Sequence, residues 1–156
     1  MKKECLLLFA MLLVGCQQQP TTPSEVEVCQ CFLNEGTGSR YKERSAPLDE
    51  ELAEKVLSLY DSLLSYDGDK KDVSDYDGNE HLGEYQCHWE WDVEERIYLS
   101  SDETNPYLYY SDGGFGTKEG KLWYVSTIHN EEMKKTVLSL QNSFSLILED
   151  IPEVEA

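Results

Sequence analysis

Residues that alternate between apolar and polar predict the strands of this protein. The clearest alternation runs over residues 82–93, where Tyr, Cys, Trp, Trp and Val at odd positions are separated by Glu, Gln, His, Glu and Asp. Because side chains along a strand point alternately to its two faces, this pattern is typical of a strand with one buried and one wet face. A similar alternation runs over residues 25–33, and short apolar runs at 96–100, 107–111 and 122–128 predict three more strands.

Two other segments have the apolar spacing of amphipathic helices. The first is expected to begin at Pro47, with acidic residues in its first turn, and to end at Leu64 or Ser65. Its apolar residues are Leu48, Leu52, Val56, Leu59 and Leu63. The second helix follows Asn130, a good capping residue, and is ended by Ile151-Pro152. Its apolar residues are Met133, Val137, Leu140, Phe144 and Leu148.

The order of these elements is a strand, a helix, a run of four strands and a second helix, which predicts an α+β fold. We expect an antiparallel sheet of about four to five strands with the two amphipathic helices packed on it. The polar segments 34–46 and 66–81 are expected to be loops. A chain of 156 residues is long enough for one such domain, which we place at residues 25–156.

The N-terminal segment has a different character. Lys2 and Lys3 precede nine apolar residues from Leu6 to Val14, whereas a helix that spans a bilayer needs about 20. The run leads into Leu13-Val14-Gly15-Cys16, and the chain then becomes polar. This arrangement, which covers about the first tenth of the chain, resembles the signal peptide and lipobox of bacterial lipoproteins. An ordinary secretory signal, or a buried N-terminal strand, is the alternative.

The resemblance implies that residues 1–15 are a signal peptide and that Cys16 becomes the lipidated N-terminus, with diacylglycerol on its thiol and a fatty acyl group such as palmitate on its amine. Residues 16–24 would then be the lipidated Cys and a flexible tether. In Gram-negative lipoproteins an Asp after the lipidated Cys favours the inner membrane. Gln17 stands there in this chain, so the resemblance implies a lipid anchor in the outer membrane, with the domain facing the periplasm.

The chain is strongly acidic. It has 31 Asp and Glu against 13 Lys and Arg, a formal net charge of −18. Removal of residues 1–15 would leave 30 acidic and 11 basic residues, a charge of −19. Nucleic-acid binders need clustered Lys and Arg, so this balance argues against a nucleic-acid partner. A field of this sign instead attracts cationic partners.

Three cysteines would remain in the domain, Cys29, Cys31 and Cys87. In an oxidising compartment we expect a disulfide from Cys87 to either Cys29 or Cys31, and the sequence leaves that choice open. A thiolate metal site that adds His88 is the alternative, but Cys87 and His88 are neighbours in a strand and should point to opposite faces. We therefore expect the disulfide, with no metal site and no other cofactor.

Motifs for catalysis are absent from the sequence, which has no nucleophile elbow, zinc-protease signature or phosphate-binding glycine loop. We therefore predict no catalytic residues and a protein that is not an enzyme. The acidic loop matches part of the calcium-loop pattern at Asp75, Asp77, Gly78 and Glu84. Val73 stands at the first ligand position, however, so a solvated loop is expected there. Calcium held loosely by Asp67, Asp69, Asp72, Asp75 and Asp77 is the alternative.

The prediction of a partner surface rests on acidic groups and tyrosines. Tyr109 and Tyr110 are neighbours in a strand, so one of them should face outward and anchor a partner. The acidic groups lie on the outer face of the first helix and in the loop after it, at Glu50, Glu54, Asp61, Asp67, Asp69, Asp72, Asp75 and Asp77.

Together these features favour a membrane-anchored lipoprotein whose acidic domain binds a protein partner, for which a basic protein is the best match in charge. An immunity protein that neutralises a toxin in the periplasm is one form of this hypothesis. The alternative is a carbohydrate- or peptidoglycan-associated module, hydrolytic in one version, that stacks sugars on its aromatic rings.

Overall fold

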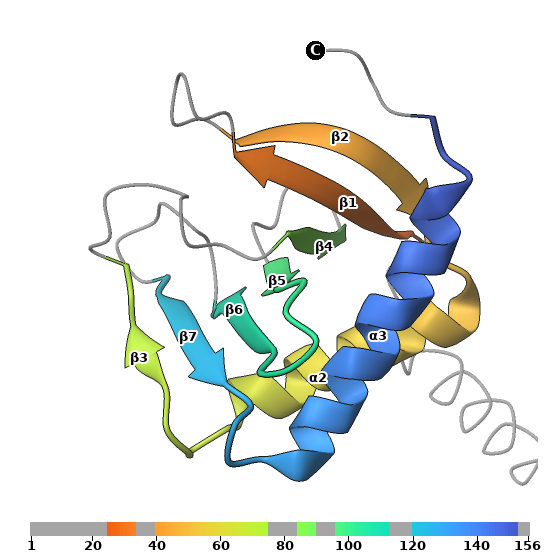
Figure 1. Ribbon diagram of the computed structural model, residues 1–156. Coiled ribbons are helices and arrows are strands. Elements are labelled where there is room, and N and C mark those ends of the chain that lie inside the picture. Colours follow the sequence, from red (N-terminus) through yellow and green to blue (C-terminus); the bar gives the residue numbers. More distant parts are fainter. Residues whose placement is uncertain (1–24, 34–39, 75–83, 90–95, 113–119, 153–156) are drawn as a thin grey trace, which may run out of the picture.

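The computed structural model describes residues 25–33, 40–74, 84–89, 96–112 and 120–152, which form one antiparallel sheet and two helices (Figure 1). The α+β fold predicted from the sequence is therefore confirmed. The elements in chain order are β1 (Val26–Leu33), β2 (Arg40–Pro47), α2 (Glu50–Leu64), β3 (Lys71–Asp72), β4 (Tyr85–Trp89), β5 (Arg96–Leu99), β6 (Tyr107–Ser111), β7 (Leu122–Ser126) and α3 (Glu131–Glu149).

The sheet has seven strands in the order β2-β1-β4-β5-β6-β7-β3, and neighbouring strands are antiparallel. The predicted count of four to five strands is wrong because two edge strands lie in segments predicted to be loops. Residues 40–47 have no apolar alternation, and the short β3 lies in the acidic segment. Edge strands are paired on one side only and tolerate polar sequences, so their presence depends on the neighbour rather than on their own pattern.

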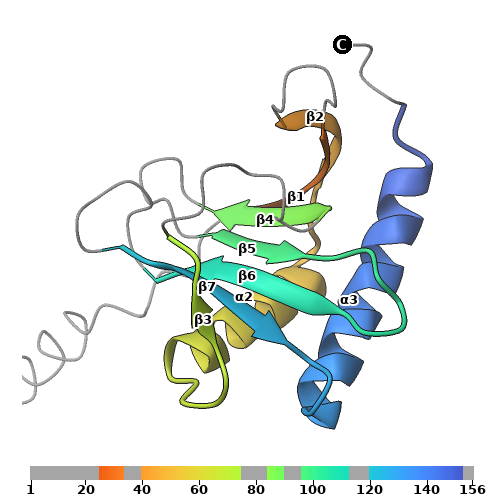
Figure 2. The same ribbon diagram turned by 60° about the vertical axis from the view of Figure 1, so that its left-hand side comes forward.

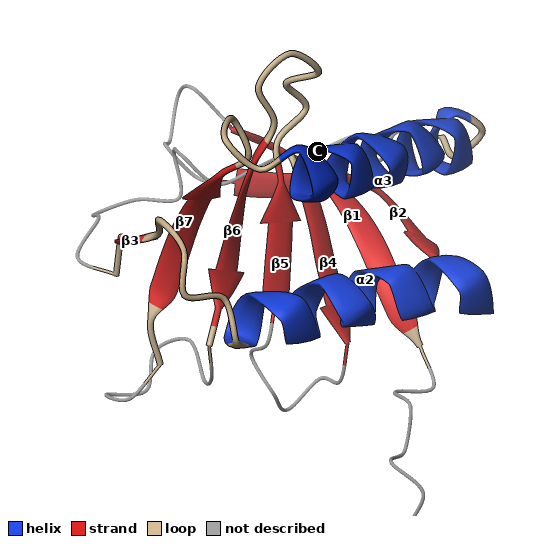
Figure 3. Cartoon of the chain, turned by 90° about the horizontal axis from the view of Figure 1, so that it is seen from below, coloured by secondary structure: helices blue, strands red, loops and turns tan. Residues whose placement is uncertain are grey.

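Both helices pack on the same face of the sheet (Figures 2 and 3). Alternate strand residues point into this layer and, with the apolar stripes of α2 and α3, form the core. The sheet contributes fully buried side chains from five strands: Val28, Cys87, Leu99, Leu108 and Val125. We call this the helix-covered face. No helix of the described residues packs on the opposite face, which we call the helix-free face.

The helices begin at side-chain caps. Asp49 accepts a hydrogen bond from the backbone N–H of Leu52 at 2.8 Å, so α2 starts at Glu50. The predicted start at Pro47 is wrong, because Pro47 still pairs with Glu27 at the end of β2. The predicted cap of α3 is confirmed, since Asn130 accepts from the N–H of Met133 at 3.0 Å.

Two polar side chains attach α3 to the sheet. The buried side-chain amide of Gln141 donates to the carbonyl oxygens of Ser100 and Asp102 between β5 and β6. Near the C-terminal end of the helix, Nη1 of Arg44 on β2 donates to the carbonyl oxygen of Leu148 at 3.2 Å. The same carbonyl also accepts from the backbone N–H of Asp150 and, at 3.1 Å, from that of Ile151. The polar strand β2 therefore adds a side-chain contact to the C-terminus of a helix.

Candidate functional site

The acidic residues predicted to bind a partner are exposed along α2 and the segment after it, to the extent that the structure describes them. Asp75 and Asp77 lie outside the described residues. No basic residue occupies the last turn of α2 to offset its negative end. We call the surface formed by these exposed carboxylates the acidic edge; it comprises Glu50, Glu54, Asp61, Asp67 and Asp69.

Asp72, predicted as part of the same surface, has local partners instead. Its carboxylate accepts hydrogen bonds from the N–H and hydroxyl of Ser74 at 3.0 and 2.6 Å, and it pairs with Lys121 at 3.7 Å. These hydrogen bonds, with the Lys121 charge, lower the pKa of Asp72. Glu84, the last position of the partial calcium pattern, accepts from the Gln30 amide at 2.7 Å. Asp72 therefore stabilises its local turn, and Glu84 links the segment before β4 to β1.

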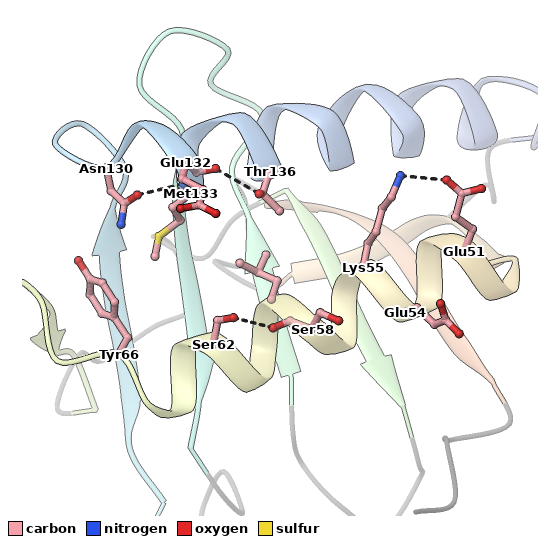
Figure 4. A pocket seen from close by; sticks show the side chains of 11 residues that line it. Glu51, Glu54, Lys55, Ser58, Ser62, Tyr66, Asn130, Glu132, Met133 and Thr136 are labelled. Atoms are coloured by element: carbon pink, nitrogen blue, oxygen red, sulfur yellow. Dashed lines mark hydrogen bonds and ion pairs between the residues drawn. The ribbon is translucent and has the colours of Figure 1, made fainter.

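A groove of about 590 Å³ lies between α2 and α3, beside the acidic edge (Figure 4). Leu59, Met133 and Tyr66 give it apolar surface, and Ser58, Ser62, Asn130 and Thr136 give it hydroxyl and amide groups. Its charged lining is Glu51, Glu54, Glu132 and Lys55. We call this the acidic groove.

The acidic groove has an excess of negative charge. Among the described residues its lining has one lysine, Lys55, which pairs with Glu51 at 3.1 Å, so three carboxylates face one ammonium group. Figure 4 shows Met133 pointing between the two helices and Tyr66 with Asn130 at one end. The arrangement joins apolar contact area to a negative rim, which is the chemistry that accepts an apolar side chain flanked by Lys or Arg.

The tyrosines predicted as anchors are both buried, so the expectation that one of them faces outward is wrong. Tyr110 is 1% exposed on the helix-covered face, where burial, followed by the Asp112 charge, raises its pKa to about 12. Tyr109 is 7% exposed on the helix-free face. It packs with Tyr107 and Tyr124, whose ring centroids lie 5.8 and 5.1 Å from its own. The two rings lie on opposite faces of β6, as the alternation predicts, but both are buried there.

The predicted disulfide is not formed, because the part of the chain that the structure describes has no disulfide between Cys87 and either Cys29 or Cys31. Cys87 lies directly opposite Val28 in the β1–β4 register, on the helix-covered face. Cys29 is adjacent to Val28 in β1 and therefore points to the other face. A disulfide needs Cβ atoms about 3.5–4.5 Å apart with converging directions, which opposite faces do not provide. Burial raises the pKa of Cys87 far above its ordinary value.

The helix-free face brings together three polar side chains from β1 and β4. The Cys29 sulfur is 3.9 Å from Nδ1 of His88 and 3.8 Å from Oε1 of Glu27, and His88 Nε2 is 3.8 Å from Oε2 of Glu27. Cys29 is buried, while the side chains of Glu27 and His88 are 28% and 25% exposed. We call this set the Glu27–Cys29–His88 cluster.

Sequence reasoning missed Glu27 in this cluster, and it missed Glu51, Glu132 and Met133 in the groove. Glu27 and Cys29 share a face of β1 by alternation, and that signal was available. Their proximity to His88 depends on the register Glu27↔His88 between β1 and β4, which are far apart in the sequence. The groove depends in the same way on how two helices pack.

Comparisons with protein-family models, with curated proteins and with solved structures find no match for this chain. Among the residues that the structure describes, neither helix is long and apolar enough to cross a membrane.

Proposed function

We propose that this protein is a lipid-anchored bacterial lipoprotein whose acidic domain binds a basic protein partner. The observation that carries the proposal is the acidic groove, in which the apolar surface of Leu59 and Met133 lies beside Glu51, Glu54 and Glu132. The acidic edge extends the same negative field along α2. A partner with one or two apolar side chains flanked by Lys or Arg matches both properties.

The two parts of this surface would act at different stages of binding. Exposed carboxylates attract a cationic partner over about 8 Å at physiological salt, and so they mainly raise the association rate. The apolar part of the groove excludes water once contact is made, and so it mainly lowers the dissociation rate. An immunity protein that neutralises a cationic toxin in the periplasm is the form of partner binding that best fits the lipobox-like segment.

A carbohydrate-binding module remains the second candidate, on one observation. Tyr107 and Tyr124 are half-buried on the helix-free face, with ring centroids 5.6 Å apart. Partly exposed rings of this kind can stack against a sugar. Binding of this type would be insensitive to salt and would be displaced by free sugar, and these two properties separate it from the first candidate.

The test compares capture of basic envelope proteins by two variants of the purified protein with equal net charge. The triple variant E51Q/E54Q/E132Q removes the charge of the groove, and the control E25Q/E149Q/D150N removes three exposed charges elsewhere. We expect the first variant to lose the captured protein and the control to keep it. The association rate between the captured protein and the unsubstituted chain should fall steeply as the salt concentration rises.

The proposal is wrong if both variants capture equally, or if the association rate is the same at low and high salt. Displacement of the captured material by free sugar, together with its loss in Tyr107→Ala and Tyr124→Ala, would instead establish the carbohydrate module.

The membrane anchor has its own test, Cys16→Ser. The lipobox-like sequence predicts that this variant is unprocessed or soluble and no longer partitions into detergent, because the diacylglycerol-bearing thiol is lost. Gln17→Ser is the matched control and should be processed and anchored normally. Fractionation of the Cys16→Ser variant with the membrane, to the same extent as the unsubstituted protein, would contradict the anchor.

A further inference from the structure

The Glu27–Cys29–His88 cluster offers a carboxylate oxygen, a thiol sulfur and an imidazole nitrogen in one small volume. One such atom from each residue lies within 4.8 Å of the other two. Backbone hydrogen bonds between neighbouring strands hold the residues on one face at a constant spacing from those opposite them. Glu27 and Cys29 are two apart on β1, and His88 is opposite Glu27 on β4, so the backbone itself holds the three together.

The separations of the donor atoms are near those around a tetrahedral metal ion. With metal bonds of about 2.3 Å to sulfur and about 2.0–2.1 Å to nitrogen or oxygen, tetrahedral angles put the donors roughly 3.3–3.6 Å apart. One carboxylate oxygen, the sulfur and one imidazole nitrogen all lie within 4.8 Å of one another. The sulfur contacts Nδ1 of His88 whereas Glu27 contacts Nε2, and only one of these nitrogens can bind the ion. Closing the site therefore requires movements of about 1 Å, which rotation of the half-buried Glu27 and His88 side chains can supply.

A cysteine nucleophile activated by His88 is the competing interpretation, and one contact argues against it. In a nucleophile–base–orienter arrangement the carboxylate contacts the imidazole nitrogen that faces away from the sulfur. The contacts at Nδ1 and Nε2 of His88 follow that order, but Glu27 also lies 3.8 Å from the Cys29 sulfur itself. That order has no role for a carboxylate beside the sulfur, whereas a shared cation is bound by both anions.

We propose that Glu27, Cys29 and His88 bind one divalent transition-metal ion, of which zinc is the best match. Mixed sulfur, nitrogen and oxygen donors suit zinc, while carboxylate is a poor ligand for Cu(I) and thiolate is a poor one for calcium or magnesium. Three protein ligands leave a fourth position for an exchangeable ligand. Cys31 lies on the same strand, but its sulfur contacts the side-chain oxygen of Gln86 at 3.7 Å and belongs to a separate contact.

The first experiment titrates the purified, metal-free protein with zinc in competition with a chromophoric chelator. We expect one zinc per chain. Changes that only support a metal ligand cost roughly 10–100-fold in affinity, so Glu27→Gln, Cys29→Ser and His88→Asn should each cost at least that much. Cys31→Ser is the matched control, because it removes a thiol from the same strand, and it should bind zinc as the unsubstituted protein does. Circular dichroism establishes that each variant is folded.

The second experiment needs no variant. Cobalt(II) added to the unsubstituted protein should give a thiolate-to-cobalt charge-transfer band and tetrahedral visible bands, and bound zinc should protect Cys29 from alkylation. Zinc should also raise the unfolding midpoint, because a ligand that binds the native state stabilises it.

Absence of stoichiometric zinc binding would overturn the proposal, as would equal loss of binding in Cys31→Ser, which would indicate unspecific thiol binding. Cobalt spectra without a thiolate band, or rapid alkylation of Cys29 that zinc does not slow, would favour the nucleophile instead. None of these outcomes depends on the partner of the acidic groove.

Discussion

The two faces of the sheet are built from alternate residues of the same strands, yet they differ in chemistry. The helix-covered face presents Val28, Leu99, Leu108 and Val125, which are all fully buried hydrocarbon. The helix-free face presents Glu27, His88 and several tyrosines, and it mixes buried with half-exposed groups. Packing against helices therefore accounts for the first face. The second keeps polar groups near the surface, where they can meet a ligand.

The cysteines make this difference concrete. Cys87 and Cys29 lie on neighbouring strands, one on each face. Cys87 lies among hydrocarbon, and its burial favours the uncharged thiol. Cys29 lies between a carboxylate and an imidazole. A thiol in the first setting behaves as a small apolar side chain, whereas the second setting has the donors of a metal site.

The largest expected difference between the faces is in stability. Phe144 is fully buried between α3 and the sheet, with its ring centroid 5.9 Å from that of Tyr85, so Phe144→Ala should destabilise the fold by about 3–5 kcal/mol. Tyr124 is half-buried on the helix-free face, and Tyr124→Ala should cost about 1–2 kcal/mol. Urea unfolding measures both. Equal costs would mean that the helix-free face is as much a core as the other.

The next difference is in the response to alkaline pH. An unfolded thiol loses its proton near pH 8.5, but burial raises the pKa of Cys87, so the native state keeps that proton. The stability contributed by this group is fully present below about pH 8.5 and falls by about 1.4 kcal/mol per pH unit above it. Unfolding measured from pH 8.5 to 10 should show this slope, and Cys87→Ala should reduce it. A slope that is the same in Cys87→Ala would contradict the assignment.

The smallest difference concerns hydroxyl groups. The Tyr60 hydroxyl on α2 donates to the carbonyl oxygen of Ser111 at 2.7 Å in a buried site, so Tyr60→Phe should cost about 1–2 kcal/mol. Tyr124→Phe on the helix-free face should change stability by less than about 0.5 kcal/mol, because Tyr124 is only half-buried. Matching losses in the two variants, measured by thermal unfolding, would remove this distinction.

Much of the fold followed from local pattern. The stripe Val137, Leu140, Phe144 and Leu148 is buried as the helical spacing predicted, and Tyr85, Cys87 and Trp89 are buried as the alternation predicted. These elements bury an apolar face, so their periodicity shows in the sequence. β2 lacks that signal because it is a polar edge strand whose formation depends on β1.

The candidate sites show the same division between local sequence pattern and tertiary contacts. The sequence by itself determined the acidic charge, the exposed outer face of α2 and the lipobox-like segment, since each depends on residues close together in the chain. Tertiary structure alone decided that Tyr109 and Tyr110 are both buried, that Cys87 faces away from Cys29, and that His88 meets Glu27. The reason is physical. Alternation gives the face on which a side chain lies, but strand register and helix packing decide which side chains meet it there, and these are set by contacts between distant parts of the chain.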